Sequence, residues 1–183
     1  MTLTLPTFAL TLMLAGPGPK GCCGMCAGEN AAPATQPAAA GVVIPDSIRT
    51  PMDVFHRLLT DHTKIRRNVT DIPGGVESVT TSDDPLVAAL IRLHVNQMKA
   101  RLESGQPIRR WDPLFAEIFR RADAIEMQVE SIPGGVRVRE TSTDEQVTLL
   151  IRQHAHRGVS EFVARGFDRA HEASPLPDGY RPR

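Results

Sequence analysis

The sequence predicts an α+β fold in which two tandem α-β-β-α repeats form one four-stranded, mainly antiparallel sheet packed with four helices. The first observation is that residues 65–103 recur as residues 125–163, at a constant offset of 60 and with 15 identities in 39 positions. Unrelated segments would share about two or three, so the unit is duplicated. The second is that each copy holds two strand-like segments around a Pro-Gly-Gly turn, followed by a segment of helical periodicity. A hairpin with two helices cannot bury a core alone, so we expect the copies to pack together about a pseudo-twofold axis.

The first repeat spans residues 51–105. Its expected elements are a helix over 51–61, strands over 65–72 and 76–81, and a helix over 85–103. Val54, Leu58 and Leu59 have helical spacing in the first helix. In the turn between the strands, proline fixes one φ angle and glycine supplies a positive one. The residues before the last helix offer capping oxygens and then a proline for its first turn.

Residues 106–166 hold the linker and the second repeat, which should form one domain with the first. The expected elements are a helix over 113–122, strands over 125–132 and 136–141, and a helix from 143 to about 165. Asp112 can cap the first of these helices, and Trp111 and Phe115 should pack together and fix the linker. Residues 167–183 are polar and rich in proline, which is typical of a loose tail.

The first 26 residues have the character of a leader. Residues 2–15 are apolar and uncharged, too short to span a bilayer but long enough for the hydrophobic region of a signal peptide. Cys22, Cys23 and Cys26 follow, and they indicate a lipid-attachment region or a soft-metal site. Residues 27–50 predict a disordered linker. We expect a cell-envelope protein, periplasmic and with membrane attachment through its N-terminus as an option, and a cytoplasmic chain is the alternative.

The composition argues against several classes of partner. Lysine and arginine number 21 and so do aspartate and glutamate, which gives no basic field for nucleic acid. One Trp, one Tyr and six Phe are too few for a base-stacking surface. No serine-histidine-aspartate pattern and no nucleophile elbow is present.

The most informative candidates are His94 and His154, which occupy equivalent places on the apolar face of the last helix of each repeat. If these helices meet at the axis, the two imidazoles approach each other in an apolar setting. Neutral imidazole binds copper, zinc, nickel and haem iron. Met98 lies one turn after His94 and would add a thioether, a donor set that favours copper. Because no Cys-x-x-Cys-His segment is present, a haem here would be of the non-covalent b type.

Gly158 marks the place where the copies differ near this site, since it stands where the first copy has Met98. Glycine inside a helix costs about 1 kcal/mol relative to alanine, and the gap suits a backbone, a side chain or a ligand. We therefore expect Gly158 to line a pocket together with His62 and Trp111. Several arginines could contact an anion, but we expect them on the surface: Arg66, Arg67, Arg92, Arg109, Arg110 and Arg152.

Several strings of the sequence resemble a family of small bacterial envelope proteins with lipoprotein-like leaders. They include Ile-Pro-Gly-Gly-Val in both copies, Trp-Asp-Pro-Leu-Phe at 111–115 and Phe-Val-Ala-Arg-Gly at 162–166, and the resemblance covers about residues 52–170. Members often carry the name aspartate carbamoyltransferase. This chain lacks the Ser-Thr-Arg-Thr phosphate loop of true carbamoyltransferases and is too short for their two α/β domains. The resemblance implies the architecture and the envelope location, and not that activity.

The sequence thus predicts an envelope protein that binds copper or b-type haem between its repeats and that works with a redox or metal-handling partner. Two alternatives remain open. One is a structural or interaction module without a cofactor, in which the histidines only pack. The other is a small enzyme that uses a histidine as acid–base.

Overall fold

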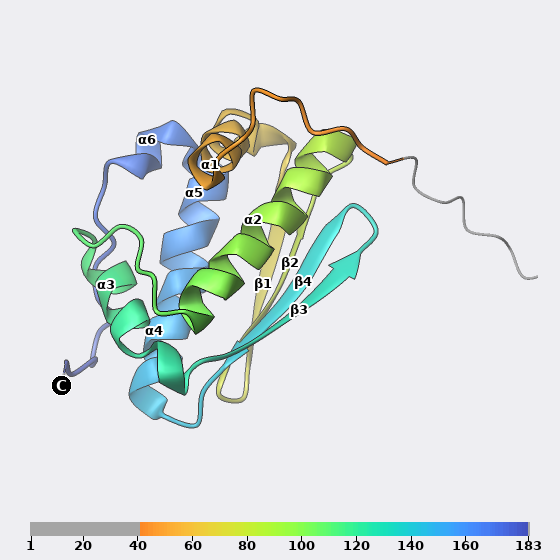
Figure 1. Cartoon of the computed structure of the whole chain (residues 1–183). Helices are drawn as coiled ribbons and strands as arrows, with labels where there is room; N and C mark the ends of the chain where they lie inside the picture. The colour runs from red at the N-terminus through yellow and green to blue at the C-terminus, as the bar shows by residue number, and fades with distance from the viewer. Residues whose placement is uncertain (1–40, 183) are drawn as a thin grey trace, which may run out of the picture. The chain divides into compact units, whose positions relative to one another are not determined.

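The computed structural model describes residues 41–182. Figure 1 shows a single sheet with helices gathered on one side of it. The expected leader and its three cysteines, Cys22, Cys23 and Cys26, lie outside the described residues. None of the helices within 41–182 has the length and apolar character needed to cross a membrane.

The elements follow the predicted order twice, and the α+β prediction is confirmed. In the first repeat they are α1 (Pro51–Thr60), η1 (His62–Lys64), β1 (Arg66–Ile72), β2 (Gly75–Thr81) and α2 (Pro85–Glu103). In the second they are α3 (Pro113–Arg120), η2 (Ala122–Ala124), β3 (Glu126–Ile132), β4 (Gly135–Thr141), α4 (Glu145–Gln153), η3 (His154–Val159), α5 (Ser160–Arg165) and α6 (Phe167–Ala170). Asp84, Asp112 and Asp144 cap α2, α3 and α4 through side-chain oxygens that accept backbone N–H groups.

The sheet has the strand order β1-β2-β4-β3 and is antiparallel throughout. Its central pair is β2 with β4, where Ser78 faces Val138. These two residues are equivalents in the duplication, so the pairing is symmetric about that point. The pseudo-twofold axis therefore passes through the centre of the sheet.

The long helices are exchanged between the repeats. Helix α2 packs mainly on β4 and β3 of the second repeat, and α4 packs mainly on β2 of the first. Leu90 and Ile91 lie in one buried cluster with Val136, while Ile151 lies in another with Val76. Each such side chain contributes roughly 1.5–3 kcal/mol on full burial. Neither repeat can therefore bury its own hairpin without the other.

The backbone of each Pro-Gly-Gly turn lies in direct contact with the backbone of the other repeat. The amide of Ser82 donates to the Gly134 carbonyl oxygen, and the amide of Ser142 donates to that of Gly74, both at 2.9 Å. A Cβ atom on Gly75 would come within 1.9 Å of the Glu140 carbonyl oxygen. Glycine is needed there because two backbones meet.

The last helix of the second repeat differs from the expected continuous helix. Whereas α2 is uninterrupted, the corresponding segment runs as α4, a π-helical turn at His154–Val159 and then α5. A π turn inserts one residue into the hydrogen-bond ladder and often marks a functional position. Here the turn begins at His154.

The two ends of the described chain are more ordered than their composition indicated. Ile44 and Ile48, expected within the disordered linker, pack against the core. The prediction that residues 167–183 form a loose tail is wrong, because Arg169 and Ser174 are only 1% and 0% exposed. Arg169 donates to the Ser174 hydroxyl, and this hydroxyl donates to the buried Asp112 carboxylate. Buried polar groups that satisfy one another fix a segment that has no apolar periodicity.

Candidate functional site

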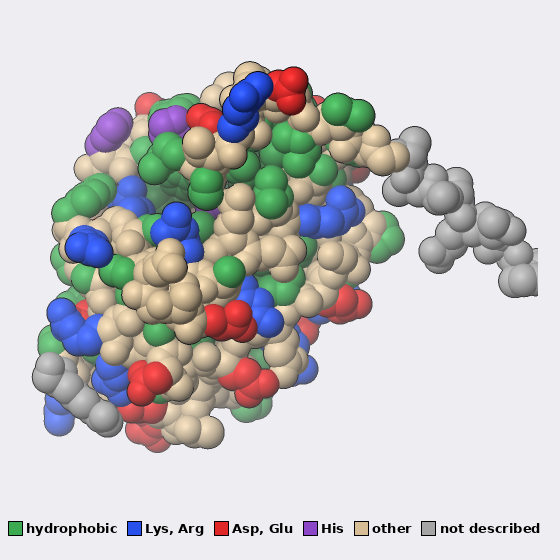
Figure 2. Space-filling view, in the orientation of Figure 1, with side chains coloured by type: hydrophobic (Ala, Val, Ile, Leu, Met, Phe, Trp, Pro, Cys, Tyr) green, Lys and Arg blue, Asp and Glu red, His purple; other side chains and the backbone are tan. Residues whose placement is uncertain are grey.

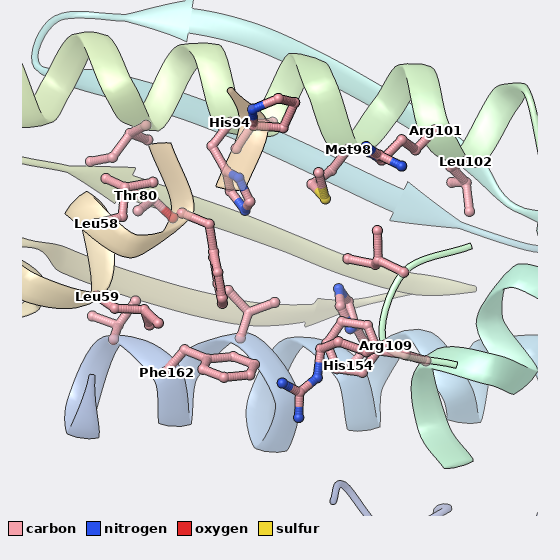
Figure 3. Close-up of a pocket in the computed structure, with 18 of the residues that line it drawn as sticks. Leu58, Leu59, Thr80, His94, Met98, Arg101, Leu102, Arg109, His154 and Phe162 are labelled. Atoms are coloured by element: carbon pink, nitrogen blue, oxygen red, sulfur yellow. The ribbon is translucent and has the colours of Figure 1, made fainter. Parts of the chain in front are cut away.

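A cavity of about 450 Å³ lies between α2 and the α4–α5 segment, with the sheet as its floor. Figure 3 shows His94, Met98 and Leu102 extending from α2 on one wall, with Phe162 on the facing helix and Leu58 and Leu59 from α1 at one end. Apolar side chains form most of the lining. Its polar members are Thr50, His62, Arg67, Thr80, His94, Arg101, Arg109, Glu140 and His154. On the outer surface, Figure 2 shows a recess beneath α1 where hydrophobic and basic side chains gather.

His94 lies against an aromatic ring in this cavity. Its imidazole stacks on Phe55, with ring centroids 5.8 Å apart and planes 24° apart. Its Nδ1 atom is buried and has no hydrogen-bond partner among the described residues. Loss of hydration lowers the pKa of His94 to about 4, so the ring is neutral at physiological pH.

His154 has a closely similar environment. Its imidazole meets the edge of Phe115, with ring centroids 5.1 Å apart, and its Nδ1 is likewise buried without a partner in the described part of the chain. Burial lowers its pKa, a nearby Glu140 opposes the shift and Arg67 adds to it. A Cβ atom on Gly158 would lie 3.3 Å from this Nδ1 and 3.8 Å from Phe115. The gap at Gly158 is thus filled by the protein's own side chains.

The buried Nδ1 atoms indicate which tautomer both histidines adopt. A proton on Nδ1 would be a buried donor without an acceptor, at a cost of about 1–3 kcal/mol. We assign the proton to Nε2, because a proton there can meet a partner in the cavity, whereas a proton on Nδ1 has no acceptor within the described residues. Both residues line the cavity, and it is the Nδ1 atom of each ring that is buried without a partner. With this assignment, each imidazole offers one N–H donor to the cavity.

Met98 lines the cavity on the same helix as His94. The expected donor set of His94, His154 and Met98 thus shares one space. Within residues 41–182, no three His, Cys, Asp or Glu side chains group as a metal site requires. A metal at this place would be bound by the two imidazoles and the Met98 thioether, and its remaining ligands would have to come from outside the described residues.

A polar cluster in the cavity floor was not predicted from the sequence. Arg67 of β1 donates from Nη1 to the Thr80 hydroxyl at 2.7 Å and from Nε to the Ser160 hydroxyl at 3.3 Å. Thr80 faces it on β2. The burial of Arg67 could have been predicted, because the strand alternation places Arg67 on the same face as Ile65 and Val69. The second repeat has Met127 and Glu140 at the equivalent positions, and both line the cavity.

The remaining candidates lie at different depths. His62 lines the cavity, and its Nδ1 lies 2.9 Å from the Val163 carbonyl oxygen, to which it can donate. Trp111, expected to line the pocket, lies outside it and is 56% exposed. It is separated from Phe115 by the Arg109 guanidinium, which lies 4.4 Å from the Trp111 ring centroid and 5.4 Å from that of Phe115. A cation therefore stands between the two rings that we expected to pack together.

Comparison with known proteins gave no match to a family profile, to a curated protein or to a solved structure.

Proposed function

We propose that this protein is a non-enzymatic binding protein of the cell envelope, whose small-molecule ligand occupies the cavity between the repeats. The observation that carries the proposal is an apolar cavity of about 450 Å³ with a few polar groups in its walls. Ligand sites have this character and volumes of about 300–1,000 Å³. The cavity is built by both repeats, so the duplication itself creates the site.

The polar groups support an organic ligand with hydrogen-bond acceptors. His94 and His154 offer N–H donors, and the Thr80 hydroxyl adds another. Neutral imidazoles suit a low-dielectric site, because they provide hydrogen bonds without the desolvation cost of a charge. Phe55, Phe115 and Phe162 would cover the apolar body of the ligand.

Copper or b-type haem is the second candidate, and the facing histidines with Met98 favour it. Ligation through Nε2 would move the proton to Nδ1 in each ring, where no acceptor lies within the described structure. Metal-bound histidines normally donate that second N–H to an acceptor. The cost makes an organic ligand the better proposal. A protein loaded with metal or haem would act with a redox or metal-handling partner.

One purification separates these candidates. The protein is isolated without a metal-affinity tag, its absorption spectrum is recorded, its copper, zinc and iron are measured, and bound organic molecules are extracted and identified by mass spectrometry. We expect a stoichiometric organic molecule and no stoichiometric metal. A Soret band or equimolar copper, lost in the His94→Leu/His154→Leu double variant, would instead establish the second candidate.

A further inference from the structure

Arg67 lies inside the cavity without an acidic partner. Its guanidinium forms no ion pair within the described residues, and its two hydrogen-bond acceptors are the hydroxyls of Thr80 and Ser160. Nη2 makes no hydrogen bond in the described part of the chain. Burial lowers the pKa of Arg67, with a smaller opposing effect of Glu140. A cation placed in an apolar cavity is costly unless an anion meets it.

The duplication shows that the fold does not need this charge. The equivalent of Arg67 in the second repeat is Met127, which also lines the cavity. An apolar side chain of similar length therefore suits the same place in the fold. An arginine at position 67 therefore suggests a purpose other than packing, and this side chain lines the cavity.

The charge balance of the cavity also favours an anion. Three arginines line it, Arg67, Arg101 and Arg109, against one acidic side chain, Glu140. Arg109 is already engaged by Asp112 and by the carbonyl oxygens of Ala170 and Glu172. Arg67 and Arg101 are left without acidic partners within the described residues. The presence of Glu140 disfavours a ligand with several negative charges, so a single carboxylate fits better than a phosphate.

We infer that the ligand is an amphipathic monocarboxylate, whose head group meets the free edge of Arg67 and the hydroxyl of Thr80, and whose apolar chain lies between α2 and α5. This inference rests on the proposed function. The Ser160 hydroxyl accepts from Arg67 and donates to the Ala155 carbonyl oxygen at 2.8 Å, so the π turn holds the guanidinium in position. The chain of the ligand would contact Leu58, Leu59 and Phe162.

The test uses isothermal titration of the full-length protein with dodecanoate and with two uncharged probes of the same chain length, dodecanol and methyl dodecanoate. The variant is Arg67→Met, which copies the residue of the second repeat. Its matched control is Arg66→Met, since Arg66 is the neighbouring arginine, points to the opposite face and pairs with Asp83. Thermal unfolding verifies that both variants fold.

We expect the wild-type protein to bind dodecanoate at least tenfold more tightly than either uncharged probe. Arg67→Met should weaken dodecanoate binding at least tenfold and leave dodecanol binding unchanged, while Arg66→Met should leave both unchanged. Equal binding of all three probes by the wild-type protein would overturn the head-group assignment and leave the proposed cavity function intact. Binding of none of the probes would overturn the inferred ligand class, whereas the proposed cavity function fails only if no organic molecule is isolated with the protein. The wild-type comparison stands even if Arg67→Met does not fold.

Discussion

The guanidinium of Arg92, on α2, donates a hydrogen bond to the carbonyl oxygen of Ile132, at the end of β3, over 3.0 Å. Its equivalent, Arg152, donates to the Ile72 carbonyl oxygen over 3.1 Å. Each arginine therefore reaches from its own helix to the hairpin of the other repeat. These two equivalent arginines therefore tie each exchanged helix to the hairpin on which it packs.

Replacing these arginines should weaken the contact between the two repeats and so lower the free energy of unfolding. Hydrogen bonds from charged groups contribute about 1.5–3 kcal/mol, and we expect Arg92→Ala to lower the free energy of unfolding by about 1–2 kcal/mol. Arg152→Ala should cost more, because Arg152 also lies 3.4 Å from the Asp71 carboxylate. Urea denaturation measures both. The control is Arg139→Ala, on the solvent face of the sheet, and losses no larger than that of the control would show that the junction does not depend on these side chains.

The second glycine of each Pro-Gly-Gly turn should tolerate no side chain. In Gly75→Ala the new Cβ would lie 1.9 Å from the Glu140 carbonyl oxygen, and in Gly135→Ala it would lie 2.0 Å from that of Thr80. Backbone must move in both cases, so we expect each variant to lose at least about 3 kcal/mol or to fail to fold. Gly41→Ala is the control, because nothing lies within 4 Å of its Cβ position. Thermal melts that match the wild type would refute the close approach.

Stability should fall as the pH drops below about 6.5. The folded-state pKa of His94 is lowered to about 4, and that of His154 is also lowered, in both cases mainly by burial. Between the two pKa values the unfolded chain binds protons that the folded protein does not, so the free energy of unfolding rises with pH in this window. For His94 the loss by pH 4 is at most about 3 kcal/mol, and less where cavity water reaches the ring.

Comparison of urea denaturation at pH 7.5 and pH 4.5 measures this effect, and His94→Leu should remove part of the difference. A wild-type protein equally stable at both values would mean that the rings are protonated in the fold.

The C-terminal segment should be part of the folded domain. The Asp112 carboxylate caps α3 and accepts from the backbone amide and the hydroxyl of Ser174, both at 3.0 Å. Ser174→Ala removes one donor from a fully buried carboxylate, and we expect a loss of about 1–3 kcal/mol. Ser131→Ala, at an exposed position of β3, should change stability little. Hydrogen exchange of the Ser174 amide at the rate of an unfolded peptide would contradict this arrangement.

The periodic parts of the chain could be predicted from the sequence. The duplication, the hairpins, the aspartate caps and the apolar stripes depend on local patterns, and the structure has them where the sequence placed them. The exchange of α2 and α4 between hairpins depends on contacts distant in sequence, which no local pattern encodes. The packed C-terminal segment was missed because its order comes from Asp112, Arg169 and Ser174, which are polar and unevenly spaced. Arg67 was assigned to the surface, although its alternation with Val69 pointed inward.

Filling the cavity with a large side chain tests most directly whether it is a ligand site. Met98→Trp would place a large ring inside it, whereas Asn96→Trp would place the same ring on the exposed face of α2. Native mass spectrometry of the wild-type protein and both variants, purified from the same cells, measures the bound small molecule. We predict one bound molecule per chain in the wild-type protein and in Asn96→Trp, and none in a folded Met98→Trp. An equal bound mass in all three proteins, or no bound molecule in the wild-type protein, would contradict the account.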